Sequence, residues 1–253
     1  MSYAEEMKTL QKFLDKNARI YTAIEPRIEW LQKIEGTVLL LLKAASKKLL
    51  LDASVGFGEF AVRTASSENT KIVKLDFSKE SLRKTKSKIT KMDLQDKIYL
   101  VAASVDHLPF KDTCFEGVTL FYSLHHFYPT VVENTLKEVH RVLKKKGRFV
   151  AVEDWAYEPR NEFQFLMLEL RRIILEKEPK VPYRTYYDYI ETMEKTNLQI
   201  FSAELYSRKV QLPPIDQLES KRALELVKKA RKFPEEQQVL DTVVIGTTKT
   251  RQN

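Results

Sequence analysis

The residues that best indicate chemistry are two glycines near position 56. An apolar run ends in Asp52 and continues into a short loop, so that residues 49–58 read LLLDASVGFG. The chain contains six glycines, and this loop holds two of them, Gly56 and Gly58. Glycine is required where a side chain would block the backbone conformation or the approach of a ligand. Residues 59–63 suit a first helical turn, whose free N–H groups would point at that ligand. The segment therefore predicts a nucleotide-binding turn.

Two acidic residues narrow the class of ligand. The segment from Gly56 to Ala61 also fits the glycine fingerprint of dinucleotide-binding proteins. Asp76 ends a second apolar run, 24 residues after Asp52, where a carboxylate can bind the ribose hydroxyls of either cofactor class. Asp52 precedes the glycines, where its charge would repel a pyrophosphate and attract an ammonium or a sulfonium. S-adenosylmethionine carries both cations, so this pattern favours it over a nicotinamide dinucleotide.

Further motifs occur in a fixed order after the glycine turn. They are Asp76-Phe77-Ser78, then Leu108-Pro109-Phe110 with Phe115-Glu116-Gly117-Val118, then Leu124-His125-His126-Phe127 with the segment from Arg141 to Phe149. In this order, over about residues 48 to 154, the chain resembles the class I S-adenosylmethionine-dependent methyltransferases. The resemblance is to the broad group that contains the ubiquinone/menaquinone-biosynthesis C-methyltransferases. It leaves a nicotinamide enzyme as a weaker alternative.

The resemblance implies a Rossmann-like α/β fold with a seven-stranded, mostly parallel sheet and helices on both faces. Leucine-rich or β-branched runs alternate with amphipathic stretches, as such a fold requires. We predict strands near 48–53, 71–75, 98–103, 117–122 and 147–153, and two final strands, 198–210 and 240–248, around a helix near 215–231. We expect one domain over residues 1–253, made of an N-terminal helical cover (1–46), a cofactor-binding core (47–154), a helical insertion that forms a substrate lid (155–197), and the final strands and helix (198–253).

The family resemblance also implies a set of cofactor-binding residues. They are Asp52, Ala53, Ser54, Gly56 and Gly58 around the methionyl and ribose groups, Asp76 at the ribose hydroxyls, Phe77 on one adenine face, Ser104 and Val105 at the adenine edge, and Ser123. A simpler interpretation of Asp76 is a strand-end acid that caps the next helix.

Three departures from the family pattern bear on cofactor affinity. Ser54 stands where the family usually has the first glycine of Gly-x-Gly-x-Gly, and Ala103-Ser104 replaces a Gly-Asp pair whose carboxylate accepts a hydrogen bond from adenine. The Lys-Pro-Gly-Gly turn has become Lys144-Lys145-Lys146-Gly147, which we expect to alter a surface hairpin. The first two changes motivate a third functional class, a cofactor-binding or scaffold protein without turnover.

Candidate acceptor-side residues follow the predicted fourth strand. Methyl transfer is an in-line displacement, so the protein chiefly aligns the reactants and, for a weak nucleophile, supplies a base. The candidates are Tyr122, Ser123, His125 and His126. Of these, His126 and Tyr122 are the predicted catalytic residues, and His126 could act as a base because histidine titrates near neutral pH. His126 could equally be a loop histidine bonded to the backbone. Glu153 and Asp154 end the fifth strand and could orient a substrate or form a salt bridge.

The composition of the chain limits the kinds of partner and location that we expect for it. The net charge of +8 attracts polyanions and supports an RNA methyltransferase as an alternative to a small-molecule enzyme, although the basic residues fall on mixed-charge helix faces. One cysteine, Cys114, rules out a cysteine-cluster metal site, and no metal is expected. The longest apolar run, residues 38–42, is too short to cross a bilayer. We therefore expect a cytoplasmic methyltransferase, monomeric or homodimeric, that transfers a methyl group to an oxygen, nitrogen or carbon atom of a small molecule.

Overall fold

The computed structural model describes most of the chain from residue 28 onward. The described residues are 28–42, 49–54, 56, 58–67, 70–154, 156, 158–175, 184–210, 212–213, 215, 218 and 220–249. Most of the predicted N-terminal cover lies outside these residues. The same holds for three aromatic residues of the predicted insertion, Trp155, Tyr157 and Tyr183.

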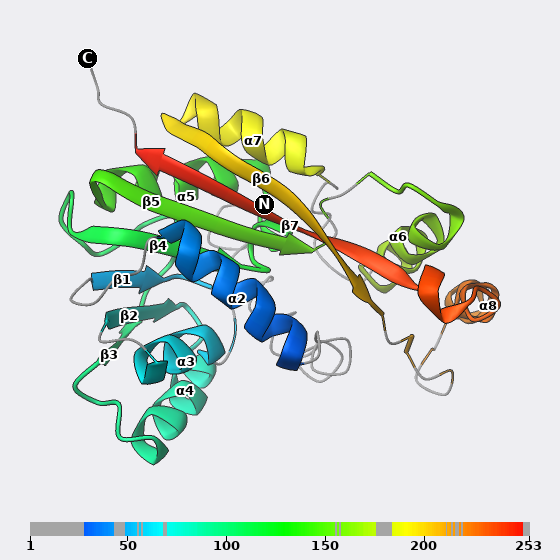
Figure 1. Ribbon diagram of the computed structural model, residues 1–253, viewed down its shortest axis with the longest axis horizontal. Helices are drawn as coiled ribbons and strands as arrows, with labels where there is room; N and C mark the ends of the chain where they lie inside the picture. The colour runs from blue at the N-terminus through cyan, green and yellow to red at the C-terminus, as the bar shows by residue number, and fades with distance from the viewer. Residues whose placement is uncertain are drawn as a thin grey trace.

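The strands form a single seven-stranded sheet with the order β3-β2-β1-β4-β5-β7-β6 (Figure 1). Their bounds are β1 Leu49–Asp52, β2 Lys71–Asp76, β3 Ile98–Ala102, β4 Phe115–Phe121, β5 Leu143–Asp154, β6 Leu198–Lys209 and β7 Val239–Lys249. β7 runs antiparallel to both of its neighbours, and the pairings of β1 to β5 are parallel. The predicted seven-stranded, mostly parallel sheet is confirmed. Its strand order reverses between β1 and β4, where ligands bind in open α/β sheets.

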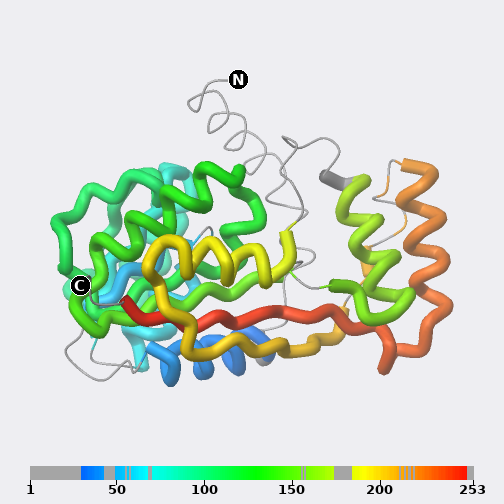
Figure 2. The backbone as a smooth tube through the Cα atoms, turned by 90° about the horizontal axis from the view of Figure 1, so that it is seen from above, coloured from blue at the N-terminus to red at the C-terminus, as the bar shows by residue number. Residues whose placement is uncertain are grey.

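Helices cover both faces of this sheet. They are α2 (Ile28–Leu42), α3 (Glu59–Ser67) and α4 (Lys79–Lys91) on one face, and α5 (Pro129–Val142) and α7 (Tyr186–Lys195) on the other. Figure 2 shows α2 and α7 on opposite sides of the ribbon formed by β6 and β7. Successive strand residues point to opposite faces, so Leu50 packs under α2 and α3 whereas Leu51 packs in the core with α5.

Arg141, at the end of α5, explains why two of the sequence motifs occur together. Its guanidinium donates to the carbonyl oxygens of Phe110 (2.7 Å) and Leu108 (3.0 Å), and it also bonds Glu138 and Asp112. The arginine of the last motif therefore holds the Leu-Pro-Phe loop of the preceding one. That loop leads from β3 to β4, so the contact fixes the chain where it enters β4.

A third, smaller core lies beyond the main sheet. Helices α6 (Glu162–Leu175) and α8 (Lys221–Ala230) pack against each other near the start of β7 (Figure 1). Phe163 is fully buried there and meets Phe233 edge to face, with ring centroids 5.8 Å apart. The predicted insertion, residues 155–197, thus contributes α6 to this core and α7 to the main one. None of the described helices is long and apolar enough to cross a membrane.

Candidate functional site

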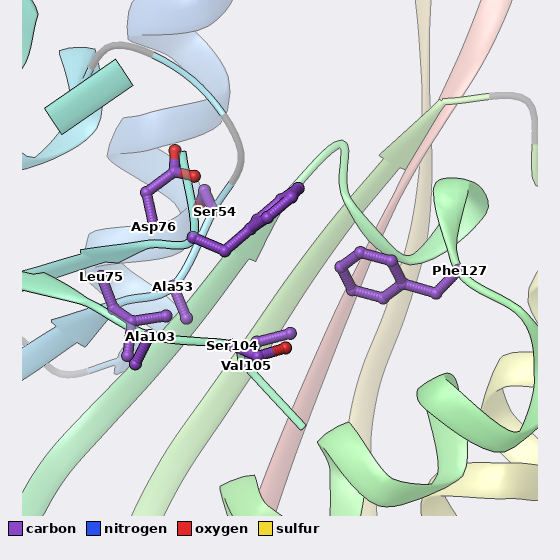
Figure 3. Close-up of a pocket in the computed structure, with 9 residues that line it drawn as sticks. Ala53, Ser54, Leu75, Asp76, Ala103, Ser104, Val105 and Phe127 are labelled. Atoms are coloured by element: carbon purple, nitrogen blue, oxygen red, sulfur yellow. The ribbon is translucent and has the colours of Figure 1, made fainter. Parts of the chain in front are cut away.

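A pocket of about 280 Å³ opens at the carboxyl ends of β1, β2 and β3 (Figure 3). It is lined by Ala53, Ser54, Leu75, Asp76, Phe77, Ala103, Ser104, Val105 and Phe127. Six of the ten predicted cofactor residues line it, and Phe127 enters from the turn after β4, as Figure 3 shows. Asp52, Gly56, Gly58 and Ser123 do not line it.

Asp76 lies at the end of β2 and is 4% exposed. One carboxyl oxygen accepts the N–H of Ser78 (2.8 Å), and the other lies 2.7 Å from the hydroxyl of Ser81. Burial raises the pKa of Asp76 above its usual value, against the opposing effect of Lys74. Both earlier interpretations of Asp76 are compatible with this geometry, because the residue ties the start of α4 to β2 and also faces the pocket.

Ser54 stands where the family usually has glycine, and its side chain has a structural role. Its hydroxyl oxygen accepts the N–H of Phe121 at the end of β4 (2.8 Å), and the residue is 5% exposed. The hydroxyl therefore joins β1 to β4 at the point where the strand order reverses. A buried N–H without an acceptor would cost about 1 to 3 kcal/mol, and Ser54 satisfies it.

Asp52 and Lys74 form an ion pair beneath the loop. Lys74 on β2 is 0% exposed, and its ammonium lies 3.8 Å from the carboxylate of Asp52 and donates to the carbonyl oxygen of Ser54. The other carboxylate oxygen of Asp52 accepts the N–H of Ser54 (3.1 Å). In this structure Asp52 thus faces a lysine of the protein. Sequence reasoning overlooked Lys74, although a lysine inside an apolar strand beside Asp52 was a visible signal.

Both loop glycines adopt positive φ angles, +129° at Gly56 and +72° at Gly58. A Cβ atom on Gly58 would approach the Cγ2 atom of Thr85 to 2.5 Å, so the loop packs tightly on α4. The Ser81 hydroxyl lies 2.6 Å from the carbonyl oxygen of Gly56. The two glycines allow the loop beside the pocket to adopt its backbone conformation, but they do not line the pocket themselves.

Ser104, which also lines the pocket, is hydrogen-bonded to an acidic residue. Its hydroxyl donates to the carboxylate of Asp106, which is 3% exposed and whose other oxygen lies 3.2 Å from Nδ1 of His107. The carboxylate that the family places at position 104 is thus found two residues later, behind the serine. Sequence reasoning also overlooked this residue.

The turn after β4 is organised by Glu153, the penultimate residue of β5. One of its carboxyl oxygens accepts the N–H groups of Ser123 (2.9 Å) and Leu124 (2.8 Å). The other lies 2.6 Å from Nδ1 of His125. Ser123 is fully buried and donates its hydroxyl to the carbonyl oxygen of Phe121 (2.7 Å). Glu153 therefore fixes the short 3₁₀ turn η1 (Leu124–His126) on the end of the sheet.

Burial controls the ionisation of Glu153 and His125. It raises the pKa of Glu153 to about 8, against the lowering effect of the three backbone N–H groups. It also lowers the pKa of His125 to about 3. A neutral imidazole therefore faces a carboxyl group that ionises only as the pH approaches 8.

The two predicted catalytic residues lie in different surroundings. His126 is 6% exposed, its ring centroid lies 4.1 Å from that of His125, and burial lowers its pKa well below the usual value. Tyr122 adopts a φ of +50° and packs on the α2 face of the sheet, where burial raises its pKa well above the usual value. Neither residue lines the pocket of Figure 3.

Asp154, beside Glu153, is neutralised within the fold. Its carboxylate binds the guanidinium of Arg208 on β6 (2.6 Å) and accepts the hydroxyl hydrogen of Thr242 on β7. Of the two acids that end β5, Asp154 thus joins the last strands and Glu153 joins the turn after β4. Among the described residues, no group of three or more histidine, cysteine, aspartate or glutamate side chains is arranged to hold a metal ion.

Comparison with known families agrees with this geometry. Residues 51–151 match the family model described as a methyltransferase domain. This segment is therefore similar to methyltransferase domains. The matched segment begins within β1 and ends within β5, so the domain contains the pocket walls and the turn held by Glu153. The resemblance to class I S-adenosylmethionine-dependent methyltransferases is confirmed.

Two curated relatives resemble this methyltransferase domain in sequence. The demethylmenaquinone methyltransferase of Lactiplantibacillus plantarum is 32% identical over 111 residues, which cover 43% of this chain and 46% of the relative. The ubiquinone/menaquinone biosynthesis C-methyltransferase of Geotalea uraniireducens is 28% identical over 152 residues, covering 55% of this chain and 63% of the relative. The matches thus span about half to three fifths of these relatives.

A solved structure extends the similarity of fold beyond the matched domain. The geranyl diphosphate C-methyltransferase from Streptomyces coelicolor A3(2), solved with Mg²⁺, geranyl diphosphate and S-adenosyl-L-homocysteine, superposes with a TM-score of 0.64 at 14% identity. The alignment covers 88% of this chain and 80% of that one. The methyltransferase domain and the elements that follow it therefore share one class I fold.

The buried pair under the loop is expected to stabilise the fold. Lys74→Met leaves the carboxylate of Asp52, 1% exposed, without its cation, and such a change costs about 3 to 5 kcal/mol. Urea unfolding should show this loss, and Lys74→Met combined with Asp52→Asn should recover much of it. Lys84→Met, which removes an exposed pair with Glu80, should cost less than about 1 kcal/mol. Equal stability of Lys74→Met and the wild type would contradict the assignment.

Glu153 is expected to make the protein less stable as the pH rises. Its pKa in the fold, about 8, exceeds the ordinary 4.5, so its contribution is present below pH 4.5 and is lost as the pH rises through 8. Between about pH 5 and about pH 9 the loss is on the order of 3 kcal/mol.

Glu153→Gln cannot ionise and should lack this loss, whereas Glu133→Gln, on the exposed side of α5, should behave as the wild type. Urea unfolding of the three proteins at both pH values measures the difference. The same pH dependence in Glu153→Gln and the wild type would show that Glu153 ionises normally.

Proposed function

We propose that this protein is an S-adenosylmethionine-dependent methyltransferase that acts on a small molecule. The observation that carries the proposal is the pocket where the strand order reverses, lined by Ser54, Asp76 and Ser104 within a methyltransferase domain. That crevice is where doubly wound sheets bind nucleotides. The sequence similarity to curated methyltransferases supports the same activity.

The polar groups of the pocket suit the proposed cofactor. Asp76 would accept hydrogen bonds from the ribose hydroxyls, and Phe77 and Val105 would contact the adenine ring. The hydroxyl of Ser104, whose hydrogen is directed to Asp106, would lie beside the adenine amino group as an acceptor. The methionyl group would extend past Ser54 toward the turn after β4. There the departing methyl group would face the acceptor.

The acceptor is proposed to be a small molecule that receives the methyl group on a carbon, oxygen or nitrogen atom. Relatives that methylate quinone precursors make a quinol ring the first acceptor to test. RNA is less favoured, because basic residues of α4 are paired within the protein. Arg83 and Lys84 bind Glu80, and Lys88 binds Glu59. A scaffold protein without turnover is also less favoured, since the fold gives the serine at position 54 a hydrogen bond.

Other proposals rest on the sequence and await tests. The division into cover, core, lid and final strands, the cytoplasmic location, and the monomeric or homodimeric state stay predictions. So do the individual roles of the cofactor-binding residues and of His126 and Tyr122.

Calorimetric titration with S-adenosyl-L-homocysteine tests the cofactor. The wild type should bind it and should bind NADH far more weakly. Asp76→Ala should weaken binding by about 1 to 3 kcal/mol through lost hydrogen bonds to a charged group. Asp96→Ala, an exposed acid just before β3 at the opposite edge of the sheet, is the matched control and should bind as the wild type. Unchanged affinity in folded Asp76→Ala would place the cofactor elsewhere.

A further inference from the structure

His125 and Glu153 form a buried pair that no binding role of the pocket explains. Nδ1 of His125 lies 2.6 Å from a carboxyl oxygen of Glu153, and the backbone N–H of His125 points at the same oxygen (3.4 Å). The Glu153 side chain is 0% exposed, and its second oxygen is occupied by the N–H groups of Ser123 and Leu124. The carboxyl group cannot rotate without breaking these bonds. The imidazole is therefore held in one orientation.

This orientation leaves one nitrogen of His125 for chemistry. The hydrogen bonds found for His125 among the described residues use its backbone N–H and Nδ1, both directed to Glu153. The side chain is 9% exposed, so a small part of the ring reaches the surface. When Glu153 is ionised it accepts the Nδ1 hydrogen, and the lone pair of the neutral ring then lies on Nε2. Nε2 can then accept a proton, because the ionised carboxylate of Glu153 would stabilise the resulting imidazolium against the burial that lowers the pKa of His125.

The charges that face this histidine favour an anionic product of deprotonation. Arg171 on α6 lowers the pKa of both His125 and His126, and it also lowers that of Tyr189 on α7. Asp154 acts on His125 in the opposite sense. Arg184, just before α7, also lowers the pKa of Tyr189, and its Nη1 atom is buried with no hydrogen-bond partner among the described residues.

Arg171 thus acts on both His125 and Tyr189, and Arg184 acts on Tyr189. The charge of Arg171 would stabilise an oxyanion formed beside His125 and would disfavour the cation that results from methylating an amine.

We propose that His125, oriented by Glu153, is the base that removes the proton from an acidic hydroxyl group, a phenol or an enol, on the methyl acceptor. This inference rests on the proposed function and names its acceptor class. The O–H proton moves to Nε2, and the resulting oxyanion, or the carbon conjugated with it, forms a bond to the methyl carbon. The bond between that carbon and the sulfonium breaks, and its electron pair stays on sulfur as the neutral thioether. After attack by carbon, the proton on that carbon is released to water.

The pair itself can be tested without any acceptor. The chain has four histidines, so long-range proton–nitrogen NMR spectra can assign each ring. Above the pKa of Glu153, about 8, we expect His125 to carry its hydrogen on Nδ1. In Glu153→Gln the amide hydrogen should face Nδ1, and the ring hydrogen should move to Nε2. A ring hydrogen on Nε2 of the wild type at about pH 9 would overturn the proposal, whatever the cofactor result.

Methyl transfer tests the acceptor class. The probes are 1,4-dihydroxynaphthalene, a catechol and a primary arylamine, each with S-adenosylmethionine, and the readout is S-adenosylhomocysteine formed. We expect transfer to a hydroxyl-bearing probe with a kcat that rises as the pH passes about 8, the pKa of Glu153. His125→Gln and Glu153→Gln should each lower kcat by about 100-fold or more, with the KM for the cofactor little changed. Glu153→Gln should also lose the pH-dependent rise.

One histidine variant serves as the comparison. His140→Gln, in the last turn of α5 at the opposite edge of the sheet, should leave kcat unchanged. Full activity of His125→Gln, or transfer to the arylamine alone, would overturn the proposal. Failure to bind S-adenosyl-L-homocysteine would instead remove the proposed function, and the NMR result would still decide the orientation of His125.

Discussion

The burial of carboxyl groups at the ligand edge of the sheet is the constraint on which the rest of the site depends. β1, β2 and β5 all end in acids, Asp52, Asp76 and the pair Glu153-Asp154, and each of these residues is at most 6% exposed. A buried carboxyl group destabilises the fold unless hydrogen bonds or a cation compensate it. The compensation comes from the turns that follow the strands. These turns therefore have one stable arrangement, and that arrangement forms the walls of the pocket.

The burial of each carboxyl group is compensated by different partners, and each acid therefore has a different role in the structure. Asp52 takes a lysine and is closed off from the pocket, whereas Asp76 takes a backbone N–H and a serine hydroxyl and still faces it. Glu153 takes backbone N–H groups and an imidazole, so its ionisation is linked to that of His125. Asp154 takes Arg208, which joins β5 to β6 across β7. One edge of one sheet thus contains two ion pairs, an acid that lines the pocket, and the pair of Glu153 with His125.

The departures from the family pattern show how such an edge tolerates change. A serine at position 54 adds a side chain where glycine is usual, and the fold directs its hydroxyl to the N–H of Phe121. A serine at position 104 removes a carboxylate, and Asp106 supplies one behind it. Both replacements keep polar atoms at the pocket with hydrogen-bond partners. This is why the altered motif remains compatible with a nucleotide-binding site.

The sequence by itself determined the elements that depend on local pattern. Hydrophobic periodicity located all seven strands to within a few residues, and the scarce glycines marked the turn at Gly56 and Gly58, which both adopt positive φ. The acid at Asp76 could be placed at the pocket because the ends of adjacent parallel strands must meet at one edge. These features follow from neighbouring residues or from a single rule of topology.

The tertiary structure alone decided which distant side chains meet. The pairing of His125 with Glu153 joins residues 28 apart in the chain, and no local pattern shows which of the adjacent residues His125 and His126 makes it. The separation of α6 from α7 into different cores was likewise invisible, because both are amphipathic helices of one predicted insertion. A pattern shows which face of an element is apolar, but its partner depends on how the whole chain packs. The chemistry of this site rests on such long-range contacts.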